Sequence, residues 1–217
     1  MTIRTRSIAH TIAAVLLIGN PLVLLADSHS VYEFTPRLNI VAGDGEPSND
    51  IPGIGLAIHR KISNEWYLGI NIDHSPLFDF EDTAGLVDGL DEEGIVDADG
   101  THTMITLVGE RRYAMESAGW TGFWNIGGGI NEVDIDDVDG PLSGGGTYDI
   151  ETDVDTELIM IGNAGWIQQL GGTWSARYEI TAEYHSADWE MTDKISGNTG
   201  DIDDYTVYGF RLGLTYR

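Results

Sequence analysis

The chain has 217 residues, of which 36 are acidic, 11 are basic, 28 are glycine and none is cysteine, so that its net charge is −25. This charge would repel phosphates and excludes a nucleic-acid partner, while the lack of cysteine excludes a disulfide scaffold, thiol catalysis and thiolate metal sites. A hydrophobic fraction of 41% is too high for a disordered acidic chain.

The first predicted element is a targeting signal over residues 1–26. Arg4 and Arg6 give a positive beginning, a mostly apolar stretch follows over residues 12–25, and Ala26 is a small residue suited to cleavage. This order is typical of a bacterial secretory signal peptide, and the apolar stretch is short for a membrane span. An N-terminal membrane anchor is the alternative. We therefore expect an exported protein whose mature domain covers residues 27–217.

Beyond the signal, the sequence predicts eight β-strands in which apolar and polar residues alternate. They are expected over residues 32–43, 53–60, 66–74, 103–113, 120–131, 158–168, 174–185 and 205–217. A period of two indicates strands with one apolar and one polar face. A membrane strand needs roughly nine to eleven residues when tilted, which is about the length of these segments.

The connections between these strands alternate in length. Those over residues 61–65, 114–119 and 169–173 are tight, whereas those over residues 44–52, 75–102, 132–157 and 186–204 are mostly long. Short periplasmic turns, long extracellular loops and aromatic residues at both ends of the apolar faces are typical of outer-membrane barrels. The sequence therefore predicts an all-β protein, an eight-stranded antiparallel up-and-down transmembrane β-barrel with long acidic extracellular loops.

Charge is divided unevenly along the chain. The long connections hold 28 of the 36 acidic residues, and Lys194 is their only base. Other charged residues fall on the polar faces of strands, where an unpaired charge in a narrow barrel interior is costly. The predicted lumen charge network consists of Glu33, Arg37, Glu110, Arg177, Glu179, Glu183 and Arg211. Such a network would hold the barrel closed, and a gated polar pore is the alternative.

The last predicted strand alternates hydrophobic residues from Tyr208 to Tyr216, and Arg217 follows. In this the chain resembles the small eight-stranded outer-membrane β-barrel family, of the OmpA transmembrane-domain, OmpX and OmpW kind, over residues 31–217. The resemblance implies a place in the bacterial outer membrane, contact with outer-membrane lipid and lipopolysaccharide, and recognition of the last strand by the barrel-assembly machinery. Members of the family end on an aromatic residue, whereas here Arg217 follows the aromatic Tyr216. We further expect a monomer.

Candidate catalytic residues are few. Residues 184–188 read Tyr-His-Ser-Ala-Asp and resemble the motif of PagL-like lipid A deacylases, which place the serine two residues after the histidine. Here His185 and Ser186 are adjacent, so that in a strand they point to opposite faces and are poorly placed for a nucleophile–base hydrogen bond. We therefore expect no enzymatic activity and no required cofactor.

An acidic segment suggests a cation site. Asp134, Asp136, Asp137 and Asp139 precede Gly140, although their spacing is not that of an EF-hand. Carboxylate oxygens are ligands for calcium and magnesium. These four aspartates are the candidate metal ligands for weak Ca²⁺ or Mg²⁺ binding, which would bridge to lipopolysaccharide phosphates. A solvated acidic surface is the alternative.

Two classes of function remain, and a PagL-like lipid A-modifying enzyme is a third that the motif disfavours. The first is a structural or surface-interaction barrel, which is favoured because side chains usually fill an eight-stranded interior. The second is a narrow channel or an OmpW-like transporter of small hydrophobic molecules, which would need an apolar lumen. The expected inward-facing apolar residues, which leave this open, are Val108, Phe123, Ile159, Ile161 and Ile167.

Overall fold

The computed structural model describes residues 31–43, 51–80, 98–141, 146–187, 189–197, 199–202 and 204–217. The predicted signal peptide over residues 1–26 lies outside these residues, as do the predicted loop residues 44–50 and 81–97. The strands of the described residues all lie in one compact unit, Tyr32–Arg217. Within the described ranges, no helix is long and apolar enough to cross a membrane.

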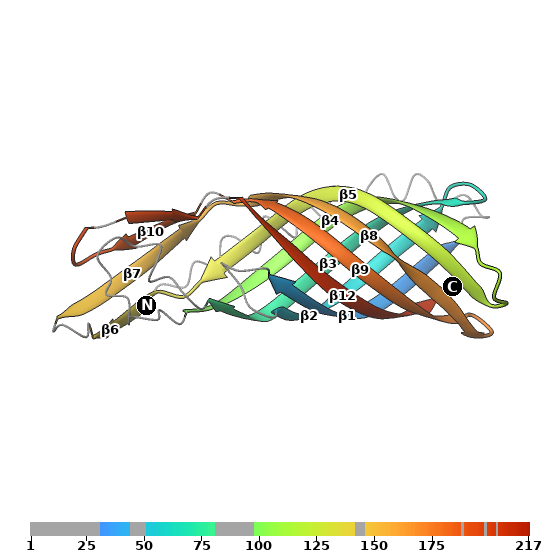
Figure 1. The fold of residues 1–217 in the computed structure, drawn as a ribbon, viewed down its shortest axis with the longest axis horizontal. Helices are drawn as coiled ribbons and strands as arrows, with labels where there is room; N and C mark the ends of the chain where they lie inside the picture. Colours follow the sequence, from blue (N-terminus) through green and yellow to red (C-terminus); the bar gives the residue numbers. More distant parts are fainter. Residues whose placement is uncertain are drawn as a thin grey trace. The chain divides into compact units, whose positions relative to one another are not determined.

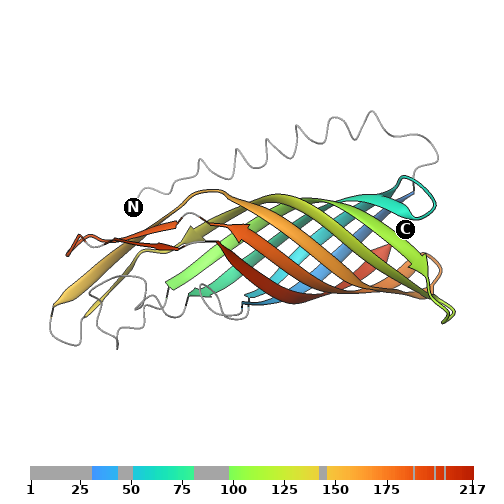
Figure 2. The same ribbon diagram turned by 45° about the horizontal axis from the view of Figure 1, so that its top comes forward.

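Eight strands close an antiparallel barrel in the order β1-β12-β9-β8-β5-β4-β3-β2 (Figure 1). They are β1 (Tyr32–Gly43), β2 (Ile51–Lys61), β3 (Trp66–Phe80), β4 (Ala98–Ala114), β5 (Trp120–Ile135), β8 (Glu157–Gly171), β9 (Trp174–Ser186) and β12 (Tyr205–Tyr216). The last strand pairs with the first, so that Leu38 lies opposite Leu212. The strands run obliquely around the barrel (Figure 2). The predicted eight-stranded antiparallel barrel is confirmed.

Two connections that were expected to be loops contain further strands. These strands are β6 (Val138–Pro141), β7 (Thr147–Val154), β10 (Trp189–Asp193) and β11 (Thr199–Ile202). They form a separate four-stranded antiparallel sheet in the order β11-β10-β7-β6, here called the extracellular sheet. The sequence did not predict them because they are short and because their acidic residues are typical of a solvated loop.

A hydrophobic core joins the extracellular sheet to the barrel. Its buried residues come from the barrel strands β5 and β12 as well as from β7 and β10. They are Val133, Ile135, Ile150, Trp189, Met191 and Val207. Because burial of apolar surface supplies most of the stabilisation of a fold, this core holds the sheet in place against the barrel strands.

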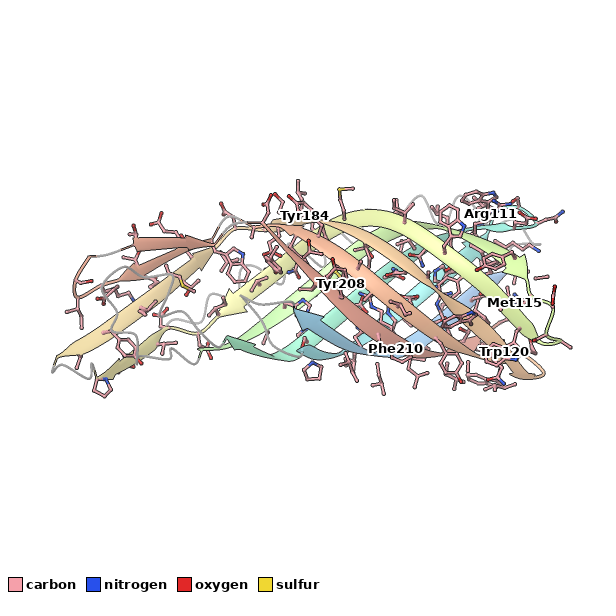
Figure 3. The ribbon with its side chains drawn as sticks, viewed as in Figure 1. Arg111, Met115, Trp120, Tyr184, Tyr208 and Phe210 are labelled. Atoms are coloured by element: carbon pink, nitrogen blue, oxygen red, sulfur yellow. The ribbon has the colours of Figure 1, made fainter. Side chains whose placement is uncertain are left out.

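The barrel turns its apolar side chains outward. Leu38 and Leu212 are 60% and 42% exposed, and Figure 3 shows Tyr184, Tyr208 and Phe210 on the outer surface of β9 and β12. The inward positions of the same strands carry charged and polar residues that are buried. A closed barrel with an apolar outside and a polar inside is the arrangement of a transmembrane β-barrel.

Close approach of paired backbones makes one inward-facing glycine of β5 essential. A Cβ on Gly129 would lie 1.9 Å from the Ile105 carbonyl oxygen and 2.7 Å from Thr106 Cα. Because paired backbones yield little, we expect Gly129→Ala to lower the free energy of unfolding by about 1–3 kcal/mol. Gly109→Ala is the matched control, since a Cβ there meets nothing within 4 Å. Equal denaturation midpoints for the two variants in lipid vesicles would contradict this interpretation.

Candidate functional site

Ion pairs fill the lumen in successive layers, beginning at the end that carries the tight turns, which is periplasmic in outer-membrane barrels. Glu33 pairs there with Arg112 at 2.7 Å and also with Arg217. The Arg112 guanidinium lies 3.6 Å from the ring centroid of Tyr67, a cation–π contact. This first layer therefore joins β1, β3 and β4 to the residue that follows β12.

Glu110 is the centre of the next layer. Its carboxylate accepts hydrogen bonds from Arg177 Nη2 at 2.5 Å and from Arg112 Nε at 2.6 Å. Arg177 also donates from Nε to Glu179 at 3.0 Å, and its guanidinium lies 3.7 Å from the ring centroid of Phe123. Glu110 and Arg177 are both buried, so that each compensates a charge that would be costly alone.

Two arginines share carboxylates in the layer above. Arg37 pairs with Asp73 and, at 3.5 Å, with Glu179. Arg211 pairs with Glu179 at 3.3 Å and with Glu183 at 2.5 Å. The two guanidiniums thereby bridge strands β1, β3, β9 and β12 across the lumen.

Glu157 is the hub of the opposite, extracellular end. Its carboxylate accepts hydrogen bonds from Asn131 Nδ2 at 2.7 Å and Trp189 Nε1 at 2.8 Å, and lies 2.9 Å from His185 Nδ1. The Tyr205 hydroxyl donates to it at 3.3 Å, and the Tyr205 ring stacks on His185 with centroids 4.5 Å apart. These partners come from β5, β9, β10 and β12, so that one buried carboxylate links the barrel to the extracellular sheet.

The structure brings all seven predicted lumen residues into this network. Sequence reasoning missed several further members, although Asp73 and Arg112 stood on the polar faces of predicted strands. Glu157 fell in the long connection expected over residues 132–157, directly before a predicted strand. The added members include Asp73, Arg112, Glu157, His185 and Arg217, and His59, whose Nε2 lies 3.5 Å from Glu110.

Apolar side chains also fill part of the lumen. The five residues expected to face inward are all buried: Val108, Phe123, Ile159, Ile161 and Ile167. Val108, Ile159 and Ile161 pack with Met104 in one cluster. The interior therefore has an apolar region formed by β4 and β8 beside the ionic network.

The adjacent His185 and Ser186 lie as expected for a strand. His185 is buried in the lumen, whereas Ser186 is exposed on the outer face of β9. His185 contacts the carboxylates of Glu157 and Glu183 at 2.9 and 3.6 Å. The pair therefore lacks the direct contact that a serine nucleophile makes with its base.

The extracellular sheet has an acidic face opposite its core. Asp153 lies directly across the ladder from Glu190, and Asp139 lies across from Asp149. Like charges directly opposite one another destabilise a sheet. This face should therefore favour any cation that reaches it.

Lys194 offsets part of this repulsion. Its ammonium lies 3.1 Å from Asp137, 3.4 Å from Glu151 and 3.7 Å from Asp149. The pKa of Lys194 is raised, mainly by its hydrogen bond to Asp137. The side chain is therefore charged at neutral pH and well above it, where the neighbouring carboxylates are ionised.

The four aspartates predicted as metal ligands fall on different elements. Asp134 is in β5, Asp136 and Asp137 are in the connection, and Asp139 is in β6. Of the part of the chain that the structure describes, no group of three or more His, Asp or Glu side chains is arranged to hold a metal ion. Weak cation binding stays a prediction for the acidic face as a whole.

Asp193 organises the turn between β10 and β11. Its carboxylate accepts hydrogen bonds from the backbone amides of Asp149, Ile195 and Ser196 at 3.1, 3.1 and 3.2 Å. A hydrogen bond from the Ser196 side chain, followed by these backbone amides, lowers the pKa of Asp193 to about 2. The ionised carboxylate is therefore the form that fits the folded turn.

This lowered pKa predicts a pH dependence of the turn. The stabilisation should be present above the pKa of an unfolded aspartate, about 3.9, and be lost as pH falls toward the folded value. We expect hydrogen-exchange protection factors of the Ile195 and Ser196 amides to fall over that window. Asp193→Asn should remove the pH dependence. Constant protection in the wild type between neutral pH and pH near 2 would contradict the assignment.

Comparison with known proteins supports the fold. No family model and no curated protein sequence matches the chain. The outer membrane protein OprG from Pseudomonas aeruginosa matches with a TM-score of 0.56 at 12% identity, over 86% of this chain and 96% of that one. A major outer membrane protein from Thermus thermophilus gives 0.55 at 11%, over 86% and 99%. Neisserial surface protein A gives 0.51 at 7%, over 86% and 96%.

At such identities the likeness concerns the fold. The closed barrel, its apolar outside and its solved counterparts define this chain as a small eight-stranded β-barrel of the bacterial outer membrane. Its surroundings are accordingly outer-membrane lipid and lipopolysaccharide.

Proposed function

We propose that this barrel has a structural or surface-interaction role, with a plugged lumen and with the extracellular sheet as its contact surface. A continuous chain of charged contacts through the lumen carries the proposal. No step in it is longer than 3.6 Å, and its members in order are Glu33, Arg112, Glu110, Arg177, Glu179, Arg211, Glu183, His185 and Glu157. An ion crossing the lumen would have to separate buried pairs, and a buried charge that loses its partner is costly.

The extracellular sheet suits a contact surface because one of its faces packs in the core shared with the barrel strands, while the opposite face is charged. Trp189 and Met191 pack into the core, while the neighbouring Glu190 points to the acidic face. Calcium and magnesium prefer carboxylate oxygens and would bridge this face to lipopolysaccharide phosphates. The proposal includes a monomeric barrel whose last strand is recognised by the barrel-assembly machinery.

Thermal stability in calcium and in sodium at matched ionic strength tests the cation role. We expect calcium to raise the melting temperature more than sodium does, because it binds the carboxylates rather than only screening them. The double variant Asp153→Asn/Glu190→Gln should reduce that difference. The control is Glu116→Gln, which changes an exposed acid in a tight turn and should leave the difference between calcium and sodium unchanged. Equal stabilisation by the two salts would contradict cation binding.

The apolar lumen cluster favours a second candidate, a narrow transporter of small hydrophobic molecules. Met104, Val108, Ile159 and Ile161 lie together inside the barrel and would line such a route. They are packed against one another, so that a solute would have to part them. Uptake of a hydrophobic dye by reconstituted vesicles tests this candidate. Uptake equal to that of protein-free vesicles would exclude it.

A further inference from the structure

A basic and aromatic patch lies on the outer face of the barrel at its tight-turn end, apart from the ion pairs of the lumen. Arg111 of β4 is opposite both Trp66 of β3 and Trp124 of β5. The two indole rings meet edge to face across it, with centroids 5.6 Å apart. Figure 3 shows Arg111 on the outer surface at this end.

One acidic neighbour holds the Arg111 guanidinium at the rim. Glu65 Oε2 accepts from Arg111 Nε at 3.1 Å and from Nη2 at 3.0 Å. The Arg111 side chain is still 47% exposed. An exposed ion pair of this kind is worth less than about 1 kcal/mol, so that an added anion can compete for the guanidinium.

A second arginine lies two strands away, on β2, and an open strip of surface lies on β3 and β4. Arg60 of β2 is opposite Leu68 of β3, and Leu68 is opposite Gly109 of β4. Gly109 is the outward position of β4 next to Arg111. The Arg60 guanidinium lies 6.0 Å from the ring centroid of Tyr32. A Cβ on Gly109 would meet nothing within 4 Å, so that the outer surface of β4 has free space at this position.

We propose that Arg111 and Arg60 bind the phosphate of an anionic glycerophospholipid in the periplasmic leaflet. Its acyl chain would lie along Leu68 and Gly109. Guanidinium groups match phosphate oxygens in geometry, and indole rings favour the level of the lipid headgroups. An anionic lipid should bind at the tight-turn end and not at the other end. The long connections at the other end are acidic and would repel it, in a chain whose net charge is −25. The site is independent of the surface role proposed above.

Relative binding of two lipids to the full-length barrel tests the site. Brominated phosphatidylglycerol and brominated phosphatidylcholine quench tryptophan fluorescence in mixed vesicles, and the ratio of quenching gives the lipid preference. We expect phosphatidylglycerol to be preferred by roughly five-fold or more at low ionic strength, since one basic residue near an anionic membrane surface contributes about that factor and the site has two. A ratio of one for the wild type would overturn the proposal.

Matched variants separate a lipid site from a purely structural ion pair. Arg60→Gln/Arg111→Gln should bring the ratio close to one, and Arg111→Lys should retain part of the preference. Glu65→Gln should raise the ratio, because it removes the competing carboxylate while keeping Arg111. Lys194→Gln, at the other end, should change nothing. An unchanged ratio in both the double variant and Glu65→Gln, with barrels that fold as the wild type does, would overturn the site.

Discussion

Replacing Glu110 by alanine should lower the free energy of unfolding by about 3–5 kcal/mol, because it leaves charges buried without their main partner. Arg177 and Arg112 donate to Glu110 at 2.5 and 2.6 Å, and all three side chains are buried. Each arginine keeps one further carboxylate, Glu179 or Glu33, which is why folding should survive. Urea unfolding in lipid vesicles, followed by tryptophan fluorescence, measures the change.

The matched control removes both charges of the pair. Glu110→Leu/Arg177→Met should be less destabilising than Glu110→Ala, since replacing a buried ion pair with apolar side chains is often close to neutral. Phe123, whose ring centroid lies 3.7 Å from the Arg177 guanidinium, would then contact an apolar side chain. If the double variant loses as much free energy of unfolding as Glu110→Leu and Arg177→Met lose in sum, the two side chains are not coupled.

Replacing Glu157 by alanine should weaken the attachment of the extracellular sheet while the barrel stays closed. Its carboxylate is the shared acceptor for Asn131, Trp189 and Tyr205 and contacts His185. A buried donor that loses its acceptor costs about 1–3 kcal/mol. We expect hydrogen-exchange protection to fall in β7 and β10 and to persist in β3 and β4.

An exposed acid on the same sheet gives the comparison for this variant. The Glu151 side chain is 58% exposed and pairs with Lys194, so that Glu151→Ala should leave the protection of β10 nearly unchanged. Uniform loss of protection throughout the barrel in Glu157→Ala would show that Glu157 stabilises the whole fold. Unchanged protection of β10 would show that the hub does not hold the sheet.

The barrel could be predicted from sequence because alternation is a local signal. In β9, Arg177, Glu179 and Glu183 occupy every second or fourth position, which places them on one face whatever the neighbouring strands are. The same parity placed Val108 and Ile161 inside. Face assignment therefore follows from the period of two, and all five of these side chains are buried.

The extracellular sheet and the Glu157 hub depend on register, which the period does not supply. In the sequence, β7 is marked by the acidic residues Asp149, Glu151 and Asp153. Its other face becomes recognisable as apolar only in the structure, where Ile150 packs in the core. The partners of Glu157 come from strands separated along the chain, as Asn131 and Tyr205 illustrate. Such contacts are set by how strands pair, so that only the structure brings them together.

A plugged lumen makes a definite claim about ion flow through the folded barrel. The measurement is ionic current across a planar lipid bilayer that holds single copies of the wild-type protein in concentrated potassium chloride. Because charged contacts run from Glu33 to Glu157 with no step longer than 3.6 Å, we expect no discrete conductance steps. Reproducible steps from the folded wild type would show that the lumen conducts and that the ion pairs do not seal it.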